Sequence, residues 1–360
     1  MHLPERTFVI AEAGVNHNGS LEQALRMVDV AAVAGADAVK FQTFEAAKLA
    51  TIRAGKAAYQ VSNTGEGGSQ RAMLAALELS RSDHEVLLQR CREKRIEFMS
   101  TAFDSDSLTF IAGLGVPMLK IPSGDITCGP LLLQAAKLGR PLVLSTGMST
   151  LAEIEEALGL LAFGMTHDSQ PSGKSDFQAA WWDASARALL RERVTLLHCV
   201  TQYPAPPGSV NLRAMDTMAS AFGLPVGYSD HTLGIEVALA AVARGASIIE
   251  KHFTLDRSLP GPDHAASLEP AELSQLVRSI HNINLALGSP VKAPSSDEAV
   301  NRSVARRSLT AARQISCGDI YRDGVLACKR PGDGVSPMYY WDVLGQPAKR
   351  DYGPDELIEQ

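Results

Sequence analysis

Little in this 360-residue sequence suggests a secreted, membrane-embedded or nucleic-acid-binding protein. The five cysteines are widely spaced and form no Cys-x-x-Cys pair, so we expect neither a disulfide framework nor a zinc knuckle. No run of about 18 apolar residues occurs, which excludes a conventional membrane-spanning helix. The net charge is −6, and no cluster of Lys and Arg with interleaved aromatic residues is present. Binding to a nucleic-acid backbone is therefore not expected.

The composition is that of an ordinary globular protein, with 45% hydrophobic and 21% charged residues. A chain of this length can form one large domain and one small one. The N-terminus MHLPERTFVI passes directly into an apolar run without a cleavage site, so we expect a cytoplasmic protein. Because the overall charge is negative, an anionic small substrate would have to be bound by local positive charges.

Short β-type runs that end in polar residues recur along the first 255 residues. They are FVIAEAG from Phe8, DAVKFQT from Asp37, IEFMSTAF from Ile96, MLKIPSG from Met118, LVLSTGM from Leu142, VTLLHCV from Val194, PVGYSDH from Pro225 and SIIEKHF from Ser247. Helical patterns such as LEQALRMVDVAAVAGA separate them. Eight nearly continuous apolar strands that alternate with helices favour a (β/α)8 TIM barrel over the alternative, a doubly wound open sheet.

The pattern predicts three regions: a catalytic barrel over residues 1–287, a Pro- and Ser-rich linker over 288–302, and a compact all-β module over 303–360. Two stretches interrupt the barrel repeat. Glu45 to Glu78 follows the second strand and is a candidate loop over the barrel mouth. Thr166 to Asp176 precedes the sixth strand, so we expect it to be solvated at the opposite end of the barrel.

Basic and hydroxyl side chains gather at the C-terminal ends of successive predicted strands, where barrel enzymes place their active sites. They are Lys40, Thr101, Lys120, Ser123 and Ser145. Lysine supplies positive charge and hydroxyls supply directional donors, so the set suits a phosphate monoester. The alternative is that these lysines extend to solvent and the hydroxyls cap the following helices.

His231 and His252 end the predicted seventh and eighth strands, so their imidazoles can approach one divalent ion. Two imidazoles with further positions open to water and substrate oxygens suit Mn²⁺ or Mg²⁺ acting as a Lewis acid, although ligand type alone also allows Zn²⁺. Taken singly, each histidine could instead be a hydrogen-bonded core residue. His198 lies in the middle of its strand, and we expect it to be structural.

Glu12 ends the first predicted strand, where a carboxylate would be costly unless it faced a polar mouth. We interpret it as a general base or a water-orienting group. The alternative is a structural salt bridge to Lys40 or Lys251.

Taken together, these strand ends resemble the sialic acid synthase family. The motifs are EAGVNHNGS, VKFQTF, STAFD, KIPSGD, LSTGM, LHCVTQYP, GYSDHTLG, EKHFTLDRSLPGPDHAAS and KRPGDGVSP, and they cover essentially the whole chain. The C-terminal module resembles type III fish antifreeze protein, the SAF domain. The resemblance implies that C3 of phosphoenolpyruvate attacks the aldehyde of an open-chain N-acyl-mannosamine, that water adds at C2, and that phosphate leaves with C–O cleavage.

The resemblance also implies roles for particular residues. Phosphoenolpyruvate would be bound by Lys40, Thr101, Lys120, Ser123, Ser145, Thr201, Ser229 and His231. His231 and His252 would hold the metal, and Glu12 would act on the water. Gln42, Tyr203 and Asp263 would contact the sugar. Arg330 would reach the sugar in the partner's barrel, which implies a domain-swapped homodimer.

The acceptor sugar is less well defined, because Asp125 stands where many relatives carry glutamate. N-acetylneuraminate and legionaminate both stay open as products, and GYSDHTLG favours legionaminate. VNHNG and KFQTF disfavour pseudaminate, for which we expect SGNHN and KLQTY. Two further functions stay open as well: a Schiff-base aldolase that uses pyruvate and Lys120, and a non-enzymatic glycan- or ice-binding protein.

Overall fold

The computed structural model describes residues 6–65 and 67–359, and the chain divides into two compact units at Gly288. In the first unit, parallel strands close into a barrel in chain order, because β1 pairs with both β2 and β8. The strands are β1 Phe8–Gly14, β2 Ala38–Thr43, β3 Glu97–Ala102, β4 Leu119–Ile121, β5 Leu142–Ser145, β6 Val194–Cys199, β7 Val226–Asp230 and β8 Ile248–His252. The predicted (β/α)8 barrel is therefore confirmed.

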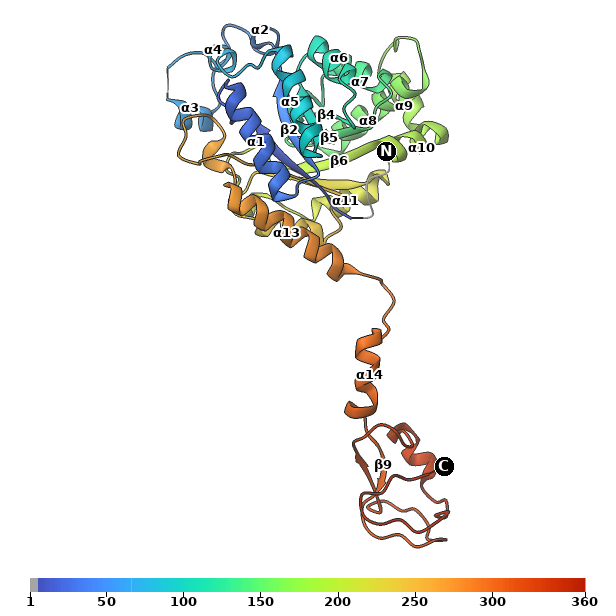
Figure 1. Ribbon diagram of the computed structural model, residues 1–360. Coiled ribbons are helices and arrows are strands. Elements are labelled where there is room, and N and C mark those ends of the chain that lie inside the picture. Colours follow the sequence, from blue (N-terminus) through green and yellow to red (C-terminus); the bar gives the residue numbers. More distant parts are fainter. Residues whose placement is uncertain (1–5, 66, 360) are drawn as a thin grey trace. The chain divides into compact units, whose positions relative to one another are not determined.

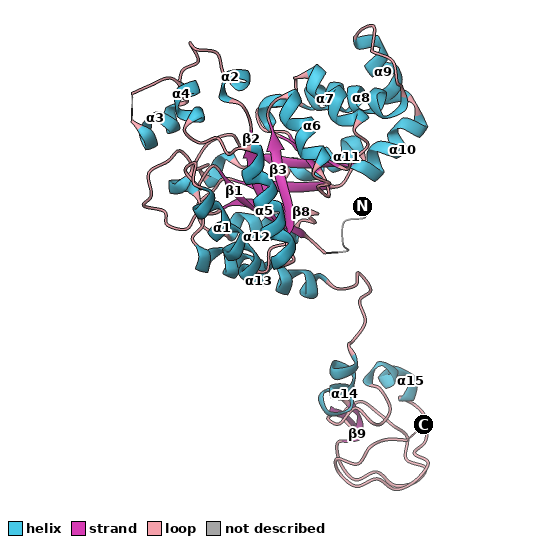
Figure 2. Ribbon diagram, turned by 45° about the horizontal axis from the view of Figure 1, so that its top comes forward, coloured by secondary structure: helices cyan, strands magenta, loops and turns pink. Residues whose placement is uncertain are grey.

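Helices surround these strands, which Figure 2 shows in magenta. They are α1 Leu21–Ala34, α5 Arg81–Lys94, α6 Ser105–Gly113, α7 Gly129–Lys137, α8 Leu151–Thr166, α9 Lys174–Trp182, α10 Ala184–Arg193, α11 Ala214–Phe222, α12 Glu236–Ala243 and α13 Pro270–Leu287. Ser20, Asp104 and Thr150 cap the N-termini of α1, α6 and α8, each accepting a hydrogen bond from a backbone N–H of the first turn. In the described part of the chain, no helix combines the length and apolarity needed to cross a bilayer.

Inside the barrel, side chains form an apolar layer beneath a polar one. The apolar layer consists of Phe8, Ile10, Ala38, Met99, Met118, Val143, Leu197 and Ile248. Because side chains alternate along a strand, the inward residue two positions further along is polar in several strands, as in Glu12 after Ile10, Lys40 after Ala38 and Glu250 after Ile248. The alternation therefore places the polar groups together at the C-terminal ends of the strands.

A completely buried ion pair joins β7 and β8 on the outer face of the barrel. Lys251 Nζ lies 2.7 Å from Asp230 Oδ2 and 2.5 Å from the carbonyl oxygen of Thr232. Tyr228 and Thr232 donate to the other carboxylate oxygen of Asp230. Both charges therefore have their hydrogen bonds satisfied, as burial away from water requires.

The segment Glu45 to Glu78 folds into three short helices: α2 Ala46–Leu49, α3 Ala58–Thr64 and α4 Gln70–Ala75. They lie together at one edge of the barrel unit (Figure 1). Residues 167–173 connect α8 to α9, and most of them are exposed. Lys137 at the C-terminal end of α7 donates to the carbonyls of Asp168 and Ser169, so this connection lies at the end of the barrel away from the strand C-termini.

The second unit begins within the expected linker, where residues 296–305 form helix α14 (Ser296–Ala305). Strands β9 (Ser308–Ala311) and β10 (Leu326–Lys329) pair antiparallel, and α15 (Tyr340–Val343) is a single turn. A small core holds the unit together, formed by Leu309, Ala311, Ile315, Tyr321, Val325, Leu326, Val343, Ala348, Tyr352 and Ile358. The unit is largely irregular with β-type pairing, as the Gly and Asp turns predicted, apart from its two helices.

We predict that Lys251→Met lowers the free energy of unfolding by about 3–5 kcal/mol, because it leaves the Asp230 carboxylate buried without a counter-charge. The measurement is urea denaturation followed by circular dichroism. Lys48→Met removes the exposed ion pairs of Lys48 with Glu45 and Asp106 and should leave the midpoint nearly unchanged. The double variant Asp230→Leu/Lys251→Met should recover part of the loss, and an unaltered Lys251→Met midpoint would contradict this account.

Candidate active site

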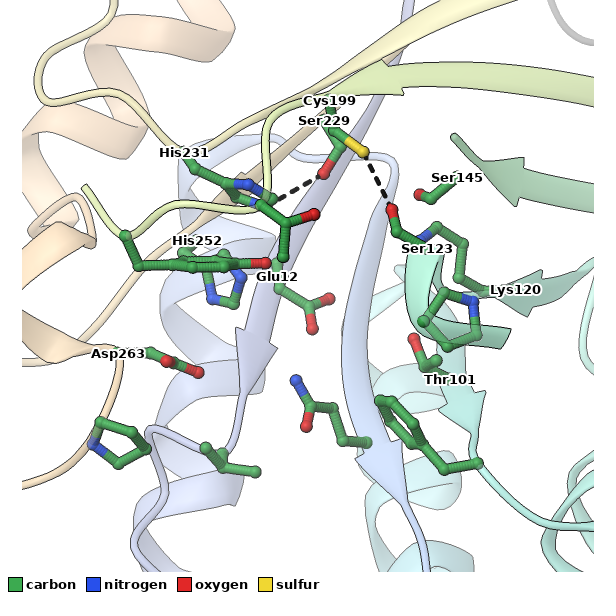
Figure 3. Close-up of a pocket in the computed structure, with 18 of the residues that line it drawn as sticks. Glu12, Thr101, Lys120, Ser123, Ser145, Cys199, Ser229, His231, His252 and Asp263 are labelled. Atoms are coloured by element: carbon green, nitrogen blue, oxygen red, sulfur yellow. Dashed lines mark hydrogen bonds between the residues drawn. The ribbon is translucent and has the colours of Figure 1, made fainter. Parts of the chain in front are cut away.

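A cavity of about 430 Å³ opens at the C-terminal ends of the barrel strands. All candidate site residues of the barrel unit line it: Glu12, Lys40, Gln42, Thr101, Lys120, Ser123, Ser145, Thr201, Tyr203, Ser229, His231, His252 and Asp263. Figure 3 shows Thr101, Lys120, Ser123 and Ser145 on one side, His231, His252 and Asp263 on the other, and Glu12 between them. Residues from strands far apart in the sequence therefore face one another.

Two carboxylates and two ammonium groups meet in the floor of this cavity, and all four side chains are buried. Lys40 Nζ lies 2.5 Å from Glu12 Oε2 and 3.5 Å from Glu250 Oε2, and Lys120 Nζ lies 3.4 Å from Glu250 Oε1. Thr101 Oγ1 accepts a hydrogen bond from Lys40 at 2.8 Å. The salt bridge of Glu12 to Lys40, weighed above as a structural role, is present, but this pair lines the cavity. Lys251 pairs with Asp230 instead.

The two carboxylates differ in their pKa values. Burial raises the pKa of Glu12, and the attraction of Lys40 only partly opposes it. Burial also acts to raise the pKa of Glu250, but Lys120 and Lys40 together outweigh it and lower that pKa. Ser229 Oγ donates to Glu250 Oε1 at 2.8 Å and stabilises the anion. Glu250 is therefore the fixed anion, and Glu12 is the carboxylate suited to exchange a proton.

The two lysines also differ. Burial acts to lower the pKa of Lys40, but the carboxylates of Glu12 and Glu250 outweigh it and raise that pKa. Burial lowers the pKa of Lys120 despite the attraction of Glu250. Lys40 is thus held as a cation by its neighbours. An anionic ligand would provide the negative charge that Lys120 lacks.

Hydroxyl groups surround Gly147 beside the lysines. Ser123 Oγ accepts a hydrogen bond from the Gly147 N–H at 3.0 Å and lies 3.1 Å from Cys199 Sγ. A Cβ atom at position 147 would lie 2.5 Å from Thr201 Oγ1 and 2.8 Å from Ser123 Oγ. Only glycine fits here, so the backbone after β5 can approach the hydroxyls and any ligand they bind.

His231 and His252 lie with their ring centroids 5.7 Å apart, and Tyr203 packs 4.1 Å from the His231 ring. His231 Nδ1 donates to the carbonyl oxygen of Val200 at 2.6 Å, and its Nε2 lies 3.4 Å from Ser229 Oγ. His252 Nδ1 is buried and has no hydrogen-bond partner. Burial lowers the pKa of both histidines, to about 4 for His231, so both are neutral at pH 7.

These histidines fit the expected metal ion, since the neutral imidazole is the form that binds metals, His252 Nδ1 has no partner, and His231 Nε2 has only the long contact with Ser229 Oγ. The described residues contain no group of three or more His, Cys, Asp or Glu arranged around one metal position. Any ion held by His231 and His252 would complete its coordination with oxygens of water or substrate.

Two of the residues that line the cavity were not among the sequence-based predictions, whereas the segment Glu45 to Glu78 lines the mouth as expected. Glu250 faces it because His252, two residues later on the same strand, does so, and strand alternation could have revealed this. Cys199 lines the wall beside Ser123. Residues of the segment 45–78 cover one side, and Tyr59 of α3 stacks on Tyr203 at 5.0 Å. No sequence motif marks these last contacts, because they depend on how that segment folds back over the mouth.

Three further residues singled out in the sequence are Asp125, Arg330 and His198. Asp125 also lines the cavity, and burial raises its pKa to about 6. Arg330 belongs to the second unit, where its Nε donates to the carbonyl oxygen of Ala305 at 2.9 Å. Its contact with sugar in a partner's barrel stays a prediction. His198, expected to be structural, lies outside the cavity lining and contacts the carbonyl oxygen of Val210 at 2.6 Å.

Comparison with known proteins identifies the family of both units. The NeuB family profile matches residues 27–292, and the SAF domain profile matches residues 306–360. The chain is similar to the N,N'-diacetyllegionaminic acid synthases of Campylobacter jejuni, at 45% identity over 99% of this chain and 100% of that one, and of Legionella pneumophila, at 46% over 94% and 89%. The crystal structure of N-acetylneuraminic acid synthetase from Leptospira borgpetersenii in complex with citrate is 36% identical, with a TM-score of 0.66 over 82% of this chain and 90% of that one.

We predict that Glu250→Gln binds inorganic phosphate at least about tenfold more tightly than the wild type, because loss of one buried negative charge leaves Lys120 and Lys40 less neutralised. Isothermal titration calorimetry measures the affinity. The matched control is Glu156→Gln, which removes an exposed carboxylate paired with Lys174 and should leave phosphate binding unchanged. Equal or weaker phosphate binding by Glu250→Gln would show that Glu250 does not compete with phosphate for Lys120 and Lys40.

Proposed function

Because this chain belongs to the NeuB family, we propose that it is an N,N'-diacetyllegionaminic acid synthase. It condenses phosphoenolpyruvate with 2,4-diacetamido-2,4,6-trideoxymannose and water, and it forms the nine-carbon 2-keto acid and phosphate. The observation that carries the proposal is the floor of the cavity, where Lys40 and Lys120 lie buried among hydroxyl groups and beside Glu12. The names of the two similar synthases from Campylobacter and Legionella favour this acceptor sugar.

Phosphoenolpyruvate has two anionic ends, a carboxylate and a phosphate, and the floor offers matching partners. Lys40 and Lys120 supply positive charge in a place screened from water, where attraction to an anion is strong. The hydroxyls that surround them can donate to phosphate and carboxylate oxygens: Thr101, Ser123, Ser145 and Thr201, and also Ser229 if its hydroxyl turns away from Glu250. Glu250 balances part of the positive charge and keeps the floor stable before the substrate binds.

The reaction then needs a C–C bond, a water molecule and a leaving group. C3 of phosphoenolpyruvate attacks the aldehyde carbon, the C–C bond forms, and the aldehyde oxygen gains a proton. C2 becomes electron-deficient and accepts a water oxygen while Glu12 takes the water's proton. The C2–O bond to phosphate breaks, the phosphate leaves with the electron pair, and the C2 hydroxyl loses its proton to the departing phosphate to leave a ketone. The proton that Glu12 takes from the water replaces the one that Glu12 gave to the aldehyde oxygen. The raised pKa of Glu12 suits a base that must also release its proton.

His231 and His252 are the residues that would hold Mn²⁺ or Mg²⁺. When bound, such an ion supplies Lewis acidity to the aldehyde oxygen of the sugar. Gln42, Tyr203 and Asp263 come from β2, the β6–α11 connection and the β8–α13 connection, and would position the sugar hydroxyls and acetamido groups. Arg330 from the second unit of a partner chain would add a further contact in a domain-swapped homodimer.

One observation favours a second candidate, a Schiff-base aldolase that uses pyruvate. Burial lowers the pKa of Lys120, as an amine nucleophile requires. That function uses neither the neutral histidine pair nor the hydroxyl cluster. Borohydride treatment in the presence of pyruvate separates the two candidates, because only an aldolase would become covalently labelled on Lys120.

We expect phosphate release from phosphoenolpyruvate to depend on the sugar. With Mn²⁺ present, 2,4-diacetamido-2,4,6-trideoxymannose should give rapid release, N-acetylmannosamine slower release, and no sugar none. Mass spectrometry of the product identifies the nine-carbon acid. Release with N-acetylmannosamine as the better substrate would reassign the protein as an N-acetylneuraminate synthase. Release with neither sugar would overturn the proposal.

Metal removal should abolish this activity. After dialysis against EDTA, phosphate release should fall to background, because neutral His231 and His252 alone supply no positive charge to the aldehyde oxygen. Added Mn²⁺ or Mg²⁺ should restore it. Full activity of the metal-free protein would contradict the assignment of these histidines as metal ligands.

A further inference from the structure

One side of the cavity is apolar. Its side chains follow the C-terminal ends of β1, β2 and β3, and we call them the apolar wall: Val15, Leu49, Met73, Leu74, Leu77 and Phe103. They also pack on one another in a cluster separate from the main core, together with Phe44. Val15 and Leu77 are buried, and the other four are partly buried. The wall is therefore a supported surface that faces the cavity.

The rest of the rim is different. Asp125 after β4 and Asp263 after β8 carry the carboxylates of the rim, and Tyr203 lies beside the histidines. Above the ends of β1 to β3, the described residues that line the cavity include no charged side chain. The polar ones there are uncharged: Tyr59, Gln60 and Gln70. An apolar part of a ligand would therefore bind most favourably on this side, because it would cover the fewest charged or polar groups there.

The segment that carries most of the wall is fixed to the barrel at several points. Ala46 N donates to Glu78 Oε1 at 2.5 Å and closes the base of the segment. Tyr59 stacks on Tyr203, and Asn63 Nδ2 donates to the carbonyl oxygen of Pro262 at 2.6 Å. α2 and α4 pack against each other. These contacts hold the wall in position over the floor.

Building on the proposed function, we propose that the apolar wall receives the C6 methyl group of the acceptor sugar and so selects a 6-deoxy sugar. The aldehyde carbon at C1 must lie near the histidines and the floor, where it meets phosphoenolpyruvate. C6 is the opposite end of the open chain, so it reaches toward the rim. Of the rim surfaces, the wall is the one that matches a methyl group.

N-acetylmannosamine has a hydroxymethyl group where the 6-deoxy sugar has a methyl. Against the wall, that hydroxyl loses hydrogen bonds to water and gains none from Met73, Leu74 or Leu49. A pocket of this kind discriminates by about 10- to 100-fold, because an apolar surface rejects an added hydroxyl only moderately. The wall therefore sets a preference in kcat/KM and does not exclude the other sugar.

The test uses three acceptors with the wild-type protein, phosphoenolpyruvate and Mn²⁺. They are N-acetylmannosamine, its 6-deoxy analogue 2-acetamido-2,6-dideoxymannose, and 2,4-diacetamido-2,4,6-trideoxymannose. Removal of the C6 hydroxyl alone should raise kcat/KM about 10-fold or more. Equal kcat/KM for N-acetylmannosamine and its 6-deoxy analogue would overturn the inference and leave the proposed function standing. Phosphate release with none of the three would overturn the proposed function itself.

Variants then show whether the wall is the cause. Met73→Gln keeps the length of the side chain and makes it polar, so the preference for the 6-deoxy analogue should fall at least about 5-fold while the KM for phosphoenolpyruvate is kept. Ile52→Gln is the matched control, because Ile52 lies in the same segment but is 76% exposed and does not line the cavity. It should keep the wild-type preference.

A second variant is available in case Met73→Gln does not fold. If circular dichroism shows that Met73→Gln is unfolded, Leu49→Gln on α2 takes its place, with the same loss of preference expected. If either variant is folded and keeps the full wild-type preference for the 6-deoxy analogue, the wall does not contact C6 of the sugar.

Discussion

The structure of the barrel depends on four ionisable side chains that are buried inside it and must compensate one another's charge. Glu12, Lys40, Lys120 and Glu250 come from β1, β2, β4 and β8, and they balance one another at distances of 2.5 to 3.5 Å. Removing charges from water is costly, and their mutual attraction compensates only when each keeps its partners. The layer of apolar side chains beneath them and the ring of helices outside supply the burial that keeps this arrangement folded.

The same cluster accounts for the division of the cavity into regions. Its cations and the nearby hydroxyls form a floor for anions, and Glu12 lies between that floor and the two neutral histidines (Figure 3). The apolar wall lies above β1 to β3, away from the carboxylates of Asp125 and Asp263. Phosphoenolpyruvate on the floor and the methyl group of an open-chain sugar on the wall would together define one orientation for the pair of substrates.

Strand positions were predictable because each strand is an apolar run that ends in polar residues, and the closed barrel then brings those ends together. Thr101, Lys120 and His252 illustrate this, since each is recognisable from its place at or next to the last residue of a strand. Glu250 is harder to recognise because its neighbours Ile249 and Lys251 face outward, and only strict alternation shows that it points inward. The wall could not be predicted, since Met73 and Leu74 read as ordinary core residues until the fold of their segment is known.

The central claim is that Glu12 handles the water that attacks C2, while the lysines and hydroxyls bind phosphoenolpyruvate. The most direct measurement compares Glu12→Gln with the wild type in two ways, by calorimetric titration with phosphoenolpyruvate and by kcat with a saturating acceptor sugar. The account predicts that phosphoenolpyruvate binds at least as tightly, because Lys40 loses a competing carboxylate, while kcat falls by about 100-fold or more. An unchanged kcat, or a loss of phosphoenolpyruvate binding that matches the loss of turnover, would contradict it.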